Sequence, residues 1–138
     1  MPALCVMVPG AARTIGRCLA SWGREVCLAG RAEAGLIVMI NIHWDGGWMQ
    51  PTATRQDEVN RRLASYWTQI ATHFKDHDEG LLFAGTNEVG MEGTWQGPTA
   101  EYAAVQNSFN QTFVNTVRAT GGNPYDENSV LATFNYSF

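Results

Sequence analysis

Three polar residues that could carry out acid/base chemistry follow two apolar runs of the chain. His43 ends the run that begins at Leu36, and Asn87 and Glu88 come directly after the run that begins at Leu81. Apolar surroundings partly remove a carboxyl group from water, which raises its pKa and suits a general acid near neutral pH. Asn87 can hydrogen-bond a substrate hydroxyl. Taken singly, Glu88 is more typical of a solvated loop residue, and His43 is compatible with a hydrogen-bonded core imidazole.

Aromatic residues follow the same two runs. Flat indole faces pack against the C–H faces of sugar rings, while nearby amides and carboxylates bind the hydroxyls. Packing in the core remains the alternative for any one of these side chains. Asp45 is a further carboxylate, although Asp-Gly-Gly is also typical of an ordinary turn. The predicted substrate-binding residues are Trp44, Trp48, Trp95 and Asp45.

The apolar runs have the composition of buried strands. Residues 36–43 and 81–86 are nearly continuous in apolar character, which is typical of strands covered on both faces, as in parallel α/β sheets. Such sheets place their chemistry beyond the carboxyl ends of the strands. We therefore expect His43 and Glu88 to reach one rim of a parallel sheet.

A helix is predicted after each of these strands. The first spans about residues 55–74, with Thr54 as its candidate N-cap, and the second is capped near Thr99 and stopped by Gly121 and Gly122. The apolar stripes are Val59, Leu63, Tyr66, Trp67, Ile70 and Phe74 in the first helix, and Tyr102, Val105, Phe109, Phe113, Val114 and Val117 in the second.

The two ends of the chain are less regular. Residues 4–8 have strand character, residues 12–28 show a helical periodicity weakened by glycines, and residues 130–134 suit either a third parallel strand or a ragged end. The chain has 138 residues, whereas a complete (β/α)₈ barrel has about 250. We therefore expect less than a whole barrel.

Composition narrows the range of partners. No apolar run approaches the roughly 20 residues that cross a bilayer, so we expect no membrane partner. Residues 35–138 hold five basic and eleven acidic residues, which argues against nucleic acid as a ligand. The three cysteines follow no zinc spacing, and no metal or organic cofactor is implied. No export signal is evident in the N-terminal residues.

Three segments together resemble a known family. AGLIVMINIHWDGGW at 34–48, FAGTNEV at 83–89 and NQTFVNTVRATGGN at 110–123 closely resemble glycoside hydrolase family 5 endoglucanases, in the family's order. The family usually has proline where Val89 stands and often a second histidine where Trp44 stands. The resemblance covers roughly residues 32–123.

The resemblance implies a fold and an activity. It implies that the chain is a partial, half-barrel-like fragment of a TIM barrel, with parallel strands alternating with helices in its third and fourth βα units. It implies an endo-β-1,4-glucanase acting on cellulose-type chains, with Glu88 as the acid/base and with Asn87 and His43 beside it. It further suggests a secreted or cell-surface location.

A second catalytic carboxylate is not identified by the resemblance. Retaining hydrolysis needs two carboxyl groups about 5–5.5 Å apart, and inversion needs about 6.5–9.5 Å. The family's nucleophilic glutamate lies on the seventh strand, which has no match here. The alternatives within the chain are Asp45, Glu92, Asp126 and Glu127. A non-catalytic carbohydrate-binding or structural remnant of a truncated cellulase therefore stays open as a second function.

The resemblance divides the chain into three parts. Residues 1–31 are an N-terminal segment whose place in the fold is left open, residues 32–123 are the glycoside-hydrolase-like βαβα region, and residues 124–138 are a C-terminal tail or strand. A partial barrel exposes sheet edges and an apolar interior face. We therefore expect a homo-oligomer that completes the half barrel.

Overall fold

The chain forms a parallel sheet with two helices packed on it. The computed structural model describes residues 3–8, 37–42, 48–77, 80–86, 89, 99–121 and 130–131. The helix predicted over 12–28 lies outside these residues. Along the chain the described elements are β1 (Ala3–Val8), β2 (Ile37–Ile42), α3 (Gln56–Phe74), β3 (Leu81–Ala84), α4 (Ala100–Ala119) and β4 (Val130–Leu131).

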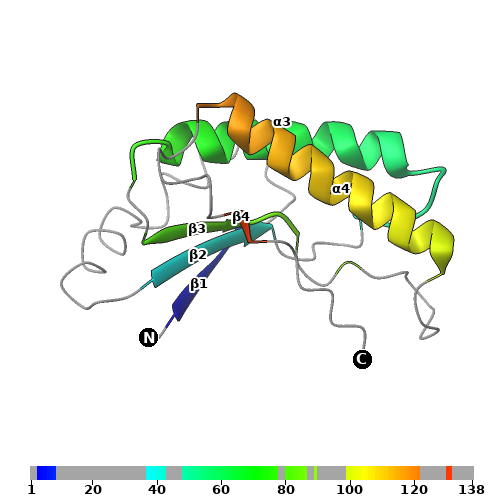
Figure 1. The fold of residues 1–138 in the computed structure, drawn as a ribbon, viewed down its shortest axis with the longest axis horizontal. Coiled ribbons are helices and arrows are strands. Elements are labelled where there is room, and N and C mark those ends of the chain that lie inside the picture. The colour runs from blue at the N-terminus through cyan, green and yellow to red at the C-terminus, as the bar shows by residue number, and fades with distance from the viewer. Residues whose placement is uncertain are drawn as a thin grey trace.

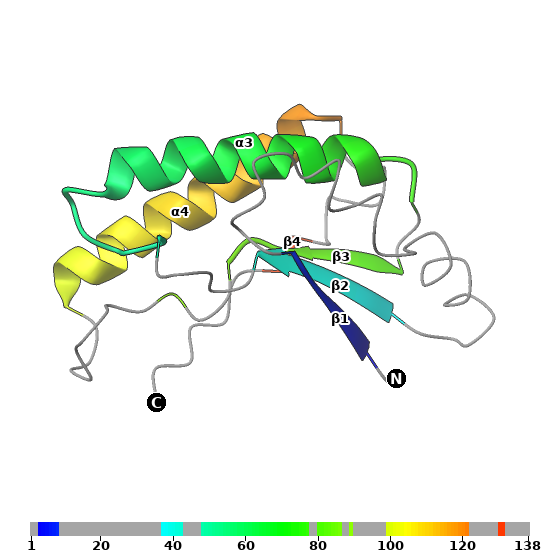
Figure 2. The same cartoon turned by 180° about the vertical axis from the view of Figure 1, so that it is seen from behind.

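The strands lie side by side in the order in which they occur in the chain. The sheet order is β1-β2-β3-β4, and every neighbouring pair is parallel. This order contains no point of reversal, which is where a doubly wound sheet would send helices to its second face. Accordingly, α3 and α4 cover the same face (Figures 1 and 2). The arrangement is that of a partial barrel, as predicted.

Strands were predicted at both ends of the chain, and the structure confirms them in part. Residues 4–8 fall within β1, which pairs with β2 from Ala3 opposite Ile37 to Val8 opposite Ile42. At the other end β4 pairs in parallel with β3, so the start of 130–134 is a strand rather than a ragged end. Residues 132–134 lie outside the described part of the chain.

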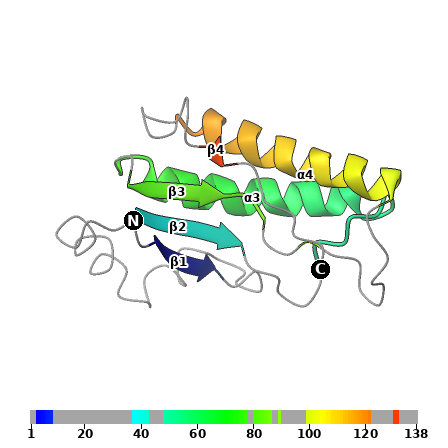
Figure 3. The ribbon, with the colours of Figure 1, turned by 60° about the horizontal axis from the view of Figure 1, so that its bottom comes forward.

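The two faces of β2 and β3 differ in burial. Val38, Ile40 and Phe83 are buried with the apolar side chains of the helices in one core. Alternate residues point to the opposite face, where Met39 pairs with Leu82 and both are only half-buried. The helices cover one face, and Figure 3 shows the other, for which the expected apolar cover stays a prediction.

The first helix matches its prediction except at its cap. Every residue of the predicted stripe is buried or packed against the core. Thr54 is not the N-cap: that position is Arg55, without a side-chain cap. Thr54 instead shares a hydrogen bond of 3.2 Å with the Thr52 hydroxyl, and the Thr52 carbonyl accepts from the Arg55 amide at 3.0 Å. The helix therefore begins one residue later than predicted, after Arg55.

The second helix is capped as predicted. The Thr99 hydroxyl accepts from the Tyr102 amide at 3.1 Å, which satisfies an otherwise unpaired donor of the first turn. Gly121 follows the helix with a φ of 78°, a conformation that glycine adopts without strain. Gly122 lies outside the described residues.

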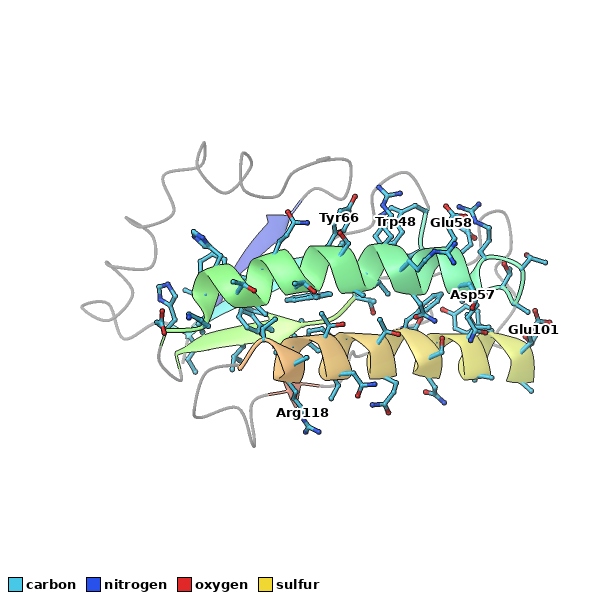
Figure 4. The ribbon with its side chains drawn as sticks, turned by 90° about the horizontal axis from the view of Figure 1, so that it is seen from above. Trp48, Asp57, Glu58, Tyr66, Glu101 and Arg118 are labelled. Carbon is cyan, nitrogen blue, oxygen red and sulfur yellow. The ribbon has the colours of Figure 1, made fainter. Side chains whose placement is uncertain are left out.

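Polar contacts fix α3 against α4, which run alongside each other in Figure 4. The side-chain Nδ2 of Asn60 donates to the Ser108 hydroxyl at 2.9 Å, and the Thr112 hydroxyl donates to the side-chain Oδ1 of Asn60 at 2.9 Å. One α3 side chain thus contacts two positions one turn apart on α4, which sets how far one helix can slide past the other. Neither helix is both long and apolar enough to cross a membrane.

Candidate active site

Most of the predicted site residues lie outside the part of the chain that the structure describes. Trp48 is described, and so are Ile42, which precedes His43, and Thr86 and Val89, which lie on either side of Asn87 and Glu88. The predicted residues outside it are His43, Trp44, Asp45, Asn87, Glu88 and Trp95.

The described flanking residues place the start of both site segments at one sheet edge. Asn41 is level with Ala84 in the parallel pairing of β2 and β3. The chain leaves β2 after Ile42 and β3 after Ala84, so both segments depart from the carboxyl ends of neighbouring strands. Enzyme sites on parallel barrels are built at this edge. The convergence of His43 with Glu88 stays a prediction.

The backbone just beyond β3 is fixed by a residue of α3. The indole N–H of Trp67 donates to the Gly85 carbonyl at 2.9 Å, in a buried position. Gly85 also lies against Phe113: a Cβ added there would be 2.7 Å from two of its ring atoms. Only a residue without a side chain allows this approach, so Trp67 and Phe113 together position the backbone of Gly85, directly after the strand.

Two side chains of α4 bind the residues on either side of Asn87 and Glu88. The Gln106 amide donates to the Thr86 hydroxyl at 3.4 Å. The Tyr102 hydroxyl donates to the Val89 carbonyl. Burial raises the pKa of Tyr102, because desolvation disfavours the phenolate. The phenol therefore remains a hydrogen-bond donor throughout the neutral range.

The sequence prediction missed Gln106 as a site-supporting residue. It is 2% exposed although it is polar, and besides Thr86 it donates to the Asn110 side chain at 3.2 Å. A signal was present: Gln106 lies one turn from Tyr102 and from Phe109, on the buried stripe of α4. A polar residue on an apolar stripe indicates a specific partner, because an unpaired buried amide is costly.

Trp48 packs in the core, which was the alternative left open for each tryptophan. It is 7% exposed, and the Arg62 guanidinium lies 4.3 Å from its ring centroid. Its ring meets Tyr66 edge-on at 5.9 Å, and the Arg62 Nε–H donates to the Tyr66 hydroxyl at 3.0 Å. Figure 4 shows Trp48 and Tyr66 on the side of α3 away from α4. Its predicted role in substrate binding stays a prediction.

The carboxylates in the described ranges all belong to the helical layer. Asp57 and Glu58 are in the first turn of α3, Asp76 follows its end, and Glu101 is in the first turn of α4. Glu58 forms an ion pair of 2.9 Å with Arg55, and Glu101 accepts from the Ala53 amide at 3.1 Å. The four candidates for a second catalytic carboxylate lie outside these ranges.

Sequential parallel strands, helices on one face and polar residues beyond the strand ends define a partial (β/α) barrel of the enzyme type. The chain belongs to glycosyl hydrolase family 5, the cellulase family, whose model matches residues 27–136. This match includes the whole predicted region 32–123 and extends into both flanking segments.

Characterised relatives are similar over most of this chain. Identity is 46% over 113 residues with the xyloglucan-specific endo-beta-1,4-glucanase BoGH5A of Bacteroides ovatus, covering 80% of this chain and 22% of the relative. Identity with cellulase/esterase CelE of Acetivibrio thermocellus is 44% over 94 residues, which cover 66% of this chain and 12% of the relative. The chain thus spans about a fifth or less of these two relatives.

Solved structures show the same fold. The Bacteroides ovatus GH5 xyloglucanase in complex with a XXXG heptasaccharide has a TM-score of 0.73 at 42% identity, over 87% of this chain and 27% of that one. A GH5-4 broad specificity endoglucanase from Clostridium acetobutylicum has a TM-score of 0.77 at 31% identity, over 94% of this chain and 41% of that one. The fragment of a TIM barrel predicted from the sequence is therefore confirmed.

Proposed function

We propose that this chain hydrolyses β-1,4-glucan by general acid/base catalysis with Glu88. The observation that carries the proposal is the common sheet edge from which the segments of His43 and Glu88 depart, in a chain of glycosyl hydrolase family 5. Similarity to a xyloglucan-specific endo-beta-1,4-glucanase and to a cellulase supports a β-glucan as the substrate.

The proposed chemistry assigns each predicted residue a task. Glu88 donates its proton to the glycosidic oxygen as the bond from the anomeric carbon breaks, and later accepts a proton from the attacking water. Asn87 hydrogen-bonds a sugar hydroxyl, and His43 lines the same subsite. The sugar rings are bound by Trp44, Trp95 and Asp45.

A second copy of the chain, bound across the face of the sheet that lies away from α3 and α4, completes the proposal. Met39 and Leu82 are half-buried on the face that lies away from α3 and α4. Covering such apolar surface stabilises association, and a second copy would supply another set of strands and a second Glu88. Sedimentation equilibrium of the purified chain is expected to show a homo-oligomer. A monomer at all concentrations would contradict this part of the proposal.

A second candidate is a carbohydrate-binding or structural remnant without turnover. It is favoured because the resemblance to the family assigns a catalytic role to a single carboxylate of this chain, Glu88. A glycosidase needs two carboxyl groups across the scissile bond.

One experiment separates the two functions. Reducing-end release from carboxymethylcellulose, mixed-linkage β-glucan and xyloglucan is measured for wild type, Glu88→Gln and the control Glu58→Gln. Glu58 is exposed on the first turn of α3, where it forms an ion pair with Arg55, so its change is expected to leave the rate unaltered. Loss of turnover in Glu88→Gln alone supports the hydrolase. No turnover in wild type, with retained affinity for cello-oligosaccharides in calorimetry, supports the remnant.

A further inference from the structure

We propose that Tyr102 and Gln106 are positioning residues that hold the Asn87–Glu88 dipeptide from both sides. The inference rests on the proposed function for its catalytic meaning. Its structural basis is independent of that function, because it concerns the described residues that bracket the dipeptide.

The two hydrogen bonds enclose the dipeptide in sequence. Gln106 binds the hydroxyl of Thr86, the residue before Asn87, and Tyr102 binds the carbonyl of Val89, the residue after Glu88. All four residues are buried, with exposures between 2% and 8%. The described residues on both sides of the dipeptide are thus bound to the same helix, α4.

The spacing on α4 makes the two anchors a single unit. Tyr102 and Gln106 are four positions apart, and residues so spaced lie on one helix face. The Thr99 cap fixes the backbone amide of Tyr102 itself, and Asn110 fixes the Gln106 amide from the next turn. Through Tyr102 and Gln106, these hydrogen bonds link the first turns of α4 to the residues that follow β3.

The geometry explains why the anchors are on α4 rather than on the loop. A general acid must stay within hydrogen-bond reach of the atom that it protonates, and a misplacement of about 1 Å can cost about a hundredfold in rate. A loop alone does not give that accuracy. Side chains that project from a packed helix do, because their own rotamers are fixed by the core.

Hydrogen exchange tests the positioning without requiring turnover. Amide exchange is followed by NMR in wild type, Tyr102→Phe, Gln106→Met and the control Tyr66→Phe. The control also removes a tyrosine hydroxyl, but one that bonds Arg62 on the far side of α3. Loss of one buried hydrogen bond is expected to raise exchange at residues 87–89 by about fivefold to tenfold in the first two variants. Exchange in the cores of α3 and α4 should not change.

Kinetics then test the catalytic meaning. If wild type hydrolyses glucan, Tyr102→Phe is expected to lower kcat about tenfold or more with KM within about twofold, because sugar contacts remain while the acid is displaced. Tyr66→Phe should leave both constants unaltered. Unprotected amides at 87–89 in wild type, or equal exchange in Tyr102→Phe and wild type, would overturn the positioning. Absence of turnover with the expected exchange pattern would overturn the hydrolase and leave the positioning intact.

Discussion

Replacing Gly85 by alanine tests the close packing at the end of β3. The added Cβ would be 2.7 Å from Cγ and Cδ1 of Phe113, whereas carbon atoms in contact prefer about 3.5–4.0 Å. Phe113 has little room to move, since it is 3% exposed and its ring centroid lies 4.6 Å from that of Trp67. Such overpacking costs about 1–3 kcal/mol. Loss of glycine's freedom in the unfolded chain offsets about 0.4–1 kcal/mol of this.

We therefore expect Gly85→Ala to lower the free energy of unfolding by about 1–2 kcal/mol. The assay is urea unfolding followed by tryptophan fluorescence, in which this loss shifts the midpoint by about 0.5–1 M at unchanged slope. In a Phe113→Leu background the smaller side chain leaves space, so the same glycine change is expected to cost less than about 0.5 kcal/mol.

A matched control uses Gly121, where the backbone conformation and not a close neighbour disfavours a side chain. Gly121 has a φ of 78° and nothing within 4 Å of an added Cβ. Gly121→Ala is expected to cost about 1–2 kcal/mol from the backbone alone, equally in both Phe113 backgrounds. If the cost of Gly85→Ala were also the same in both backgrounds, the steric explanation would be refuted.

Three further predictions concern the same region. Thr99→Ala removes the cap on the Tyr102 amide and is expected to cost about 1 kcal/mol in urea unfolding; an unchanged midpoint would contradict the cap. Trp67→Phe leaves the buried Gly85 carbonyl without its donor and is expected to cost about 1–3 kcal/mol; a smaller loss than Thr99→Ala would contradict it. Because burial raises the pKa of Tyr102 in the folded chain, the unfolded chain loses this proton first. Stability is therefore expected to fall as pH rises above about 10, more steeply in wild type than in Tyr102→Phe; parallel pH profiles would count against it.

The main elements could be predicted because their patterns are local. The apolar stripe from Val59 to Phe74 has the period of a helix and lies inside α3, and the apolar run after Leu36 contains β2. Thr99 and Gly121 marked the ends of α4 through chemistry that acts within one turn. The parallel arrangement followed from alternating strands and helices.

Features that depend on which of several possible hydrogen-bond partners a side chain takes could not be predicted. Thr54 has the right side chain for a cap, but a competing hydrogen bond to Thr52 uses its hydroxyl. Gln106 can be buried because the side chains of Thr86 and Asn110 accept hydrogen bonds from its side-chain amide. The sequence does not reveal these partners. At the site, the common edge was predictable from strand polarity, while the residues beyond it remain predictions.

The order of the strands bears on how the sheet assembles during synthesis. Each described strand after β1 pairs with the strand that precedes it in the chain. When such a strand leaves the ribosome, the strand with which it pairs has therefore already been synthesised. The helices α3 and α4 fill the intervals between successive strands from β2 to β4. The entropic cost of closing a loop grows only slowly with the length of the loop. Adding each new strand to the sheet therefore costs about the same loop-closure entropy as adding the one before it. A chain wound in this way can grow one βα unit at a time, without waiting for a strand encoded further on.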